Sequence, residues 1–145
     1  MSLSLVFAGE RRGVFRLEGP TNGLLDQAAE HGWNVVVLDT SGVHDKDGFM
    51  AAVDDAFDLP AWFGRNWDAL DECLRALDLD DPDGLLVLWQ NWDSFAIADP
   101  DAFETAVAVF LDATVAWHDD ETPGAVVLQG EGPETDLPTL TRGQH

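Results

Sequence analysis

The residues best suited to bind a partner in this chain are three carboxylates and a pair of large aromatic residues that lie close together in the sequence. Trp62 and Phe63 come first, and a short predicted helix follows them. One face of that helix carries four charged residues, namely Asp68, Asp71, Glu72 and Arg75. Carboxylates grouped in this way can bind basic side chains of a partner through charge-assisted hydrogen bonds, and rigid aromatic residues often anchor such contacts. The alternative is a solvated helix face whose acids are stabilised by the positive end of the helix dipole.

Catalytic chemistry is not indicated by the other reactive side chains. Asp68 and Glu72 lie one turn apart on one helix, so they do not flank a substrate as the two carboxyls of a glycosidase do. Cys73 falls on the predicted inward face, which favours a packed thiol over a nucleophile. The histidines are scattered, at His31, His44, His118 and His145. With no nucleophile elbow, phosphate loop or dinucleotide fingerprint, we expect a protein that is not an enzyme and uses no cofactor.

Metal binding is not expected either. Residues 78–84 resemble a calcium loop at first sight, but Pro82 and Asp83 stand where such a loop needs its glycine and ligands. The single cysteine, Cys73, excludes an internal disulfide and a cysteine metal site. Low cysteine content fits a reducing compartment, and we predict a cytoplasmic protein.

A loop, a glycine turn and a helix must position the charged face. Pro60 disfavours helix at Leu59, so a preceding helix ends there, and Gly64 permits a sharp turn. Asn66 is a good N-cap for a helix over residues 67–77. The apolar residues of this helix repeat at the spacing of a buried stripe, which comprises Leu70, Cys73, Leu74 and Leu77.

The same stretch resembles the loop and second helix of the barstar family, the intracellular inhibitors of barnase-type ribonucleases. The resemblance is carried by Leu59-Pro60, Trp62-Phe63-Gly64, Asn66, Asp68-Ala69-Leu70 and Cys73-Leu74, and it extends more loosely from Trp33 to Gln129. It implies a three-stranded parallel sheet, near residues 34, 85 and 125. It also implies a ribonuclease inhibitor or immunity protein, whose acidic helix face mimics RNA phosphates in the nuclease active site. An acidic adaptor for a basic protein remains the alternative.

The resemblance implies a set of partner-binding positions, which are Trp62, Phe63, Gly64, Asn66, Asp68, Asp71, Glu72, Arg75 and Asp112. Asp68 and Glu72 match the two principal acids of the family, the second with Glu in place of Asp. Trp62 matches the aromatic residue that stacks on the catalytic histidine of the nuclease. Asp71 replaces an aromatic residue and Arg75 a small polar one, so the target ribonuclease remains open.

The whole chain is expected to form one α/β domain, a small three-stranded parallel sheet covered by helices. We assign residues 1–130 to a single barstar-like domain, with an extension over 1–32 and a family-like core over 33–130. Residues 131–145 are expected to form a loose tail. The extension is predicted to add a β-hairpin, over Leu3–Ala8 and Gly13–Leu17, and a short helix at one edge of the sheet.

The remaining expectations concern individual strands, helices and loops and the side chains that they bury. Residues 34–39 are apolar throughout their centre, which predicts a strand buried on both faces. Residues 91–99 are predicted to form a loop. The longest helix, over 101–118, is predicted to turn inward a set comprising Phe103, Val107, Phe110, Leu111 and Val115. Other strands are predicted at 85–90 and 124–128, and another helix is predicted to end before Pro60.

Charge is the dominant feature of the composition, with 28 acidic against 7 basic residues and a net charge of −21. Such a chain is a poor ligand for nucleic acid or an anionic membrane and a good one for a basic protein. The family resemblance implies that this partner is a basic ribonuclease or toxin domain. General solubility or adaptation to high salt is the alternative explanation. No apolar run approaches a membrane span and no signal-peptide pattern begins the chain. We expect a monomer when free.

Overall fold

The computed structural model describes residues 13–17, 22–59, 63–76, 84–119, 124–130, 132, 133 and 137. Several expectations therefore lie outside the described residues. They are the strand at Leu3–Ala8, the positions Pro60 to Trp62, Leu77, the charged loop over 78–83, and most of the tail beyond 130.

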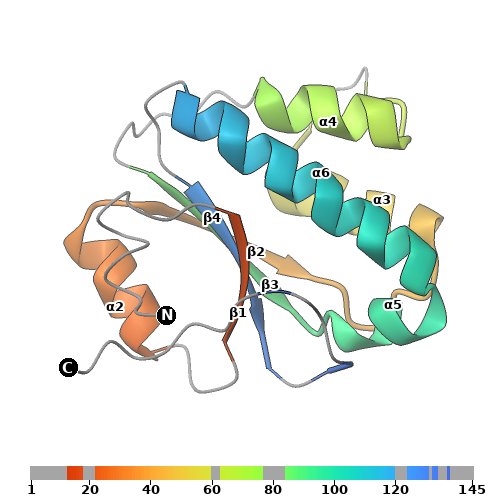
Figure 1. The fold of residues 1–145 in the computed structure, drawn as a ribbon, viewed down its shortest axis with the longest axis horizontal. Helices are drawn as coiled ribbons and strands as arrows, with labels where there is room; N and C mark the ends of the chain where they lie inside the picture. Colours follow the sequence, from red (N-terminus) through yellow and green to blue (C-terminus); the bar gives the residue numbers. More distant parts are fainter. Residues whose placement is uncertain are drawn as a thin grey trace.

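The centre of the fold is a parallel sheet with four strands among the described residues (Figure 1). Its order is β1 (Gly13–Leu17), β4 (Gly124–Gln129), β3 (Leu85–Gln90) and β2 (Asn34–Asp39). The expected count of three is therefore wrong, because β1 pairs with β4, with Gly13 opposite Ala125. The prediction that the N-terminal extension adds a strand at one edge is confirmed, and the described partner of that strand is β4.

Helices cover both faces of this sheet (Figure 1). One face carries α3 (Lys46–Phe57), α4 (Trp67–Arg75), α5 (Asp93–Ala98) and α6 (Pro100–Asp119). The other face carries α2 (Asn22–Glu30). The predicted α/β architecture and parallel pairing are confirmed.

The two sheet faces support two separate hydrophobic cores. On the α2 face, Phe15, Leu86 and Val127 pack with residues of α2. On the opposite face, a larger core contains many aromatic rings. Phe49 lies at its centre and is fully buried. Its ring stacks on that of Phe95 at 5.0 Å and is tilted against that of Trp89 at 5.5 Å.

The expectation that β2 is buried on both faces is wrong. Val35 is 39 % exposed and Val37 is 48 % exposed, whereas Leu38 on the opposite face is buried. In the described sheet β2 is an edge strand, paired only with β3. The apolar run correctly predicted a strand at this place in the sequence. The exposure of its side chains, however, depends on the position of β2 at the edge of the sheet.

The segment over residues 91–99 is not the predicted loop, because it contains helix α5. Phe95 and Ala96 of this helix are buried, and Trp92, just before it, is fully buried. A helix of six residues is too short to show a periodic pattern, and helices this short depend on tertiary packing rather than on intrinsic propensity.

The inward face of α6 differs from the prediction. Phe103 and Phe110 are buried as expected, but Leu111 and Val115 are 40 % and 42 % exposed. The core positions are instead completed by a second set of buried residues, namely Ala106, Ala113 and Trp117. Because α6 is apolar around most of its circumference, sequence periodicity does not define which side faces the sheet.

Candidate functional site

The start of α4 is fixed by the N-cap that the sequence predicted. Asn66 has an extended backbone, with φ of −133°, and its side-chain oxygen accepts a hydrogen bond of 2.8 Å from the backbone N–H of Ala69. This bond satisfies one of the amide groups that a helix leaves without an intrahelical partner. The cap sets the first turn of the helix, and therefore the direction in which Asp68 projects.

Replacing Asn66 by alanine is expected to lower the free energy of unfolding by about 1 kcal/mol, because one capping bond is lost. Chemical denaturation followed by circular dichroism measures the change. Asn66→Asp serves as the control, since aspartate caps helices about as well as asparagine. Equal losses in the two variants would contradict the capping role.

The inward face of α4 is confirmed for every predicted position that the structure describes. Leu70, Cys73 and Leu74 are buried. The backbone carbonyl of Leu74 accepts a buried hydrogen bond of 2.8 Å from the indole N–H of Trp117, which ties α4 to α6. Burial raises the pKa of the Cys73 thiol, and the negative charges of Glu72 and Asp54 raise it further. Cys73 is therefore a packed, protonated thiol.

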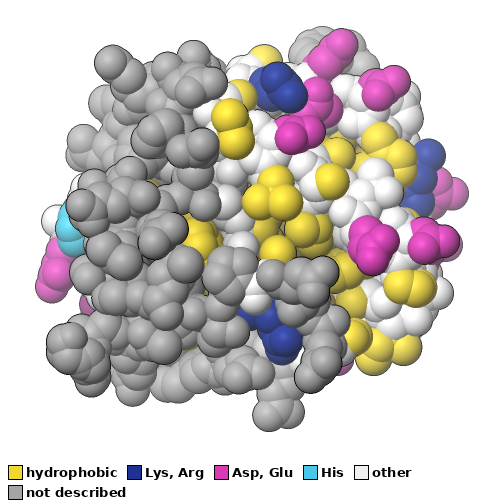
Figure 2. All heavy atoms as spheres, viewed as in Figure 1, with side chains coloured by type: hydrophobic (Ala, Val, Ile, Leu, Met, Phe, Trp, Pro, Cys, Tyr) yellow, Lys and Arg dark blue, Asp and Glu magenta, His cyan; other side chains and the backbone are white. Residues whose placement is uncertain are grey.

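The outward face of α4 is acidic and open to solvent. Asp68 and Glu72 are exposed, and Asp71 is partly buried. Within the part of the chain that the structure describes, neither Asp68 nor Glu72 takes part in an ion pair. On the face shown in Figure 2, acidic side chains gather over α4. Both carboxylates therefore face solvent, and no ion pair within the described residues occupies them.

Arg75 interrupts this negative face, but it is paired with Asp71. Its Nε donates a hydrogen bond of 3.0 Å to a carboxylate oxygen of Asp71, one helical turn earlier. This bond raises the pKa of the Arg75 guanidinium, and the charges of Asp71 and Asp112 raise it further. Asp112 is exposed on α6. The two helices thus contribute to one charged region, which we call the acidic surface, composed of Asp68, Asp71, Glu72 and Asp112.

The aromatic part of the predicted site is only partly described. Phe63 is 8 % exposed and packs in the larger core, so its ring supports the loop instead of lying on the surface. Gly64 is exposed beside it. Trp62 lies outside the described residues, and its role in binding a partner stays a prediction. The half-buried Trp67 at the start of α4 packs toward the core, with its ring centroid 5.8 Å from that of Phe49.

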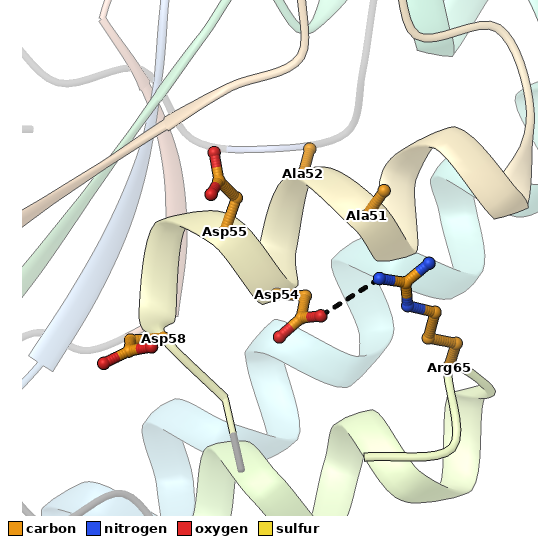
Figure 3. A pocket seen from close by; sticks show the side chains of 6 residues that line it. All are labelled: Ala51, Ala52, Asp54, Asp55, Asp58 and Arg65. Carbon is orange, nitrogen blue, oxygen red and sulfur yellow. Dashed lines mark hydrogen bonds and ion pairs between the residues drawn. The ribbon is translucent and has the colours of Figure 1, made fainter. Parts of the chain in front are cut away.

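Sequence reasoning missed an acidic hollow of about 560 Å³ beside the start of α4 (Figure 3). It is lined by Ala51, Ala52, Asp54, Asp55, Asp58 and Arg65. A guanidinium nitrogen of Arg65 lies 3.2 Å from a carboxylate oxygen of Asp54, and this ion pair joins the loop before α4 to α3. The signal that could have identified it is the presence of three aspartates within five residues at the end of α3.

Neither a metal site nor a membrane-spanning helix is found within the described residues. No cluster of three or more histidine, cysteine, aspartate or glutamate side chains there is arranged to hold a metal ion. None of the helices in the described part combines the length and the apolar character needed to cross a membrane.

The parallel sheet, its helical layers and the acidic surface define a small acidic α/β protein. A family model described as Barstar (barnase inhibitor) matches residues 33–129, about two thirds of the chain. The chain therefore belongs to the barstar family, whose members are inhibitors and not enzymes. The match begins at the residue where the sequence resemblance began, and β1 and α2 precede it.

Comparisons with individual proteins add little. No curated protein matches this chain. Among solved structures, one similar chain comes from a structure of Drosophila ORC bound to AT-rich DNA and Cdc6, with a TM-score of 0.46 and 15 % sequence identity. The alignment covers 88 % of this chain and 43 % of the other, so this chain spans less than half the length of that protein.

Proposed function

We propose that this protein inhibits a basic ribonuclease by covering the nuclease active site with the acidic surface. The observation that carries the proposal is the outward face of α4. In a member of the barstar family, Asp68 and Glu72 lie one turn apart, exposed and without an ion pair among the described residues. We further propose that the inhibitor is monomeric when free and acts in the cytoplasm.

The proposed mechanism is mimicry of RNA phosphates. A ribonuclease that cleaves RNA must hold phosphate groups with cationic side chains, and these side chains bind carboxylates by the same charge-assisted hydrogen bonds. Asp68 and Glu72 would enter these phosphate sites, and Asp112 would add a contact from α6. We propose that Trp62 stacks on the catalytic histidine, while Gly64 and Asn66 hold the loop and helix in place beside it.

Arg75 is the feature that fits least simply with a basic target. Its ion pair with Asp71 offers an explanation, because the guanidinium is already matched by a carboxylate 3.0 Å away. The Arg75–Asp71 pair therefore contributes little net charge, and the attraction is dominated by Asp68, in the first turn of the helix, and by Glu72, near its middle. A target with an acidic group facing Arg75 would be preferred over one with a basic group there.

Inhibition of RNA cleavage tests this proposal. Purified protein is titrated into barnase, and then into a panel of other basic ribonucleases, with a fluorogenic RNA substrate. We expect cleavage by at least one nuclease to fall to background at equimolar inhibitor, with a one-to-one complex by light scattering. A complex that forms while RNA cleavage continues would overturn inhibition and support the adaptor alternative.

The association rate with the inhibited ribonuclease is expected to fall steeply as salt rises. A net charge of −21 attracts a basic partner over long distances, and added ions screen this attraction. Stopped-flow mixing across a series of salt concentrations measures the rate. The dissociation rate, which depends on short-range contacts, provides the internal comparison and should change much less. An association rate that is independent of salt would show that the acidity serves only solubility.

A further inference from the structure

The outward face of α6 carries an apolar strip that the fold does not explain. Leu111 and Val115 lie one helical turn apart and are 40 % and 42 % exposed, and Ala108, one turn before Leu111, is also exposed. Part of Leu111 rests on β1, since a Cβ added to Gly13 would lie 3.4 Å from its Cδ2. The rest of the side chain faces solvent. We call Ala108, Leu111 and Val115 the apolar strip.

Apolar residues on both faces are unusual for a helix on the surface of a protein. The inner side of α6 already packs on the sheet through Phe110, Ala113 and Trp117, which are buried. A helix that is apolar on opposite sides is typically covered on both, and an exposed apolar patch rimmed by polar residues often marks a protein-binding site. The apolar strip therefore indicates a contact that forms in an assembly.

The apolar strip is continuous with the acidic surface. Asp112 is adjacent to Leu111 in sequence and is exposed with it on α6. Its charge also acts on Arg75 of α4, so the two helices share one electrostatic environment at this point. Figure 2 shows hydrophobic side chains gathered over α6, with acidic side chains above them and to their right. Glu104, exposed one turn before Ala108, adds a carboxylate at the other end of the strip.

The negative charges beside the apolar strip determine which kind of partner can bind it. A second copy of the chain would also carry a net charge of −21. In a two-fold contact centred on the strip, each copy would bring its own Asp112 and Glu104 toward those of the other. Like charges placed together at an interface are unfavourable. A basic protein meets the strip and its acidic border without this repulsion.

We propose that Leu111 and Val115 form an apolar contact for the same basic ribonuclease that engages the acidic surface, so that the interface extends from α4 across α6. The partner would present an apolar patch bordered by lysine or arginine residues. This inference rests on the proposed function and adds to it a specificity determinant, because a nuclease without such a patch would be held by the acidic surface alone.

The test is the double variant Leu111→Ala/Val115→Ala, with the ribonuclease inhibited in the assay above as the probe, beginning with barnase. Both side chains are exposed and alanine favours helix, so the fold is expected to be retained. The dissociation rate should rise on the order of tenfold, because several buried methyl and methylene groups are removed. No charge changes, so the association rate and its salt dependence should stay the same.

A matched control is Leu25→Ala/Val37→Ala, which truncates the same two residue types where they are 38 % and 48 % exposed on α2 and β2. It should bind as the unmodified protein does. If the α6 variant also binds normally while Glu72→Ala binds weakly, the contact on α6 is wrong and the proposed function stands. If the unmodified chain inhibits no ribonuclease, both the proposed function and the contact on α6 are wrong. A dimer by ultracentrifugation that the α6 variant abolishes would show that a second copy covers the strip, which overturns the inference.

Discussion

Replacing Glu72 by alanine is expected to raise the dissociation rate of the ribonuclease complex by roughly 30-fold to several thousandfold, equivalent to 2–5 kcal/mol. In the free protein the Glu72 carboxylate is exposed and has no ion pair among the described residues. In the proposed complex it is desolvated among the cations of a phosphate site. Its removal leaves those cations buried without a partner, which costs far more than the loss of an exposed ion pair. Surface plasmon resonance and inhibition of RNA cleavage measure the change.

Glu30→Ala is the matched control for this experiment. Glu30 is an exposed glutamate in the last turn of α2, a helix on the opposite face of the sheet from α4. Both variants remove one acid of 28, so any effect of total charge is the same in both. Small, equal losses of affinity in the two variants would contradict phosphate mimicry by α4 and would support attraction by bulk charge.

Replacing Phe49 by alanine is expected to lower the free energy of unfolding by about 3–5 kcal/mol, the usual range for a buried phenylalanine. The Phe49 ring is fully buried and stacks at 5.0 Å on that of Phe95. It also lies 5.8 Å from Trp67, the first residue of α4. The cavity would therefore open directly beneath the helix that carries the acidic surface. Thermal and urea denaturation of the purified variant measure the loss.

Phe57→Ala, on the same helix, provides the comparison. Phe57 is only partly buried, and its ring pairs with that of Phe110 at the longer distance of 6.5 Å. The same substitution should therefore cost clearly less than at Phe49. A loss at Phe57 as large as that at Phe49 would mean that the core is not centred where the ring contacts place it.

The features that could be predicted from sequence are those that local physical chemistry determines. The cap of α4 is one example, because a single side chain, Asn66, satisfies an amide three residues later. The inward position of Leu70, Cys73 and Leu74 is another, since the acids on the other side of α4 leave only one apolar face. The strand β3 was also predicted with its bounds, because its apolar run lies in the middle of the sheet.

The features that could not be predicted depend on neighbours that are distant in sequence. The exposure of Val37 follows from the edge position of β2, which nothing within β2 itself encodes. The strand at Gly13–Leu17 was expected at an edge of the sheet, but its pairing with β4, which places Gly13 opposite Ala125, could not be predicted. On α6, the apolar residues surround the helix, and only packing against the sheet distinguishes Phe110 from Leu111.

The candidate site also contains residues whose positions could be predicted from the sequence and others whose positions could not. Asp68 and Glu72 were placed on the outward face of α4 by periodicity, and the structure has them exposed there. Phe63 was placed among the partner-binding residues beside them, but its ring lies in the core, because an aromatic residue in a loop can turn either way. The proximity of Asp112 to Arg75 was not visible from periodicity, since it depends on how α6 packs against α4.

The strand order has a consequence for synthesis of the protein on the ribosome. In the described sheet β4 lies between β1 and β3, so β1 gains its partner only after translation has passed residue 129. Until then the nascent chain carries Phe15 and Leu17 on a strand whose neighbour in the described sheet has not been made. Such long-range pairing slows folding and leaves unpaired strand edges able to aggregate. By contrast, β2 and β3 can pair as soon as residue 90 has emerged. Among the described strands, β2 and β3 can therefore pair first, and β1 is joined only when β4 has been made.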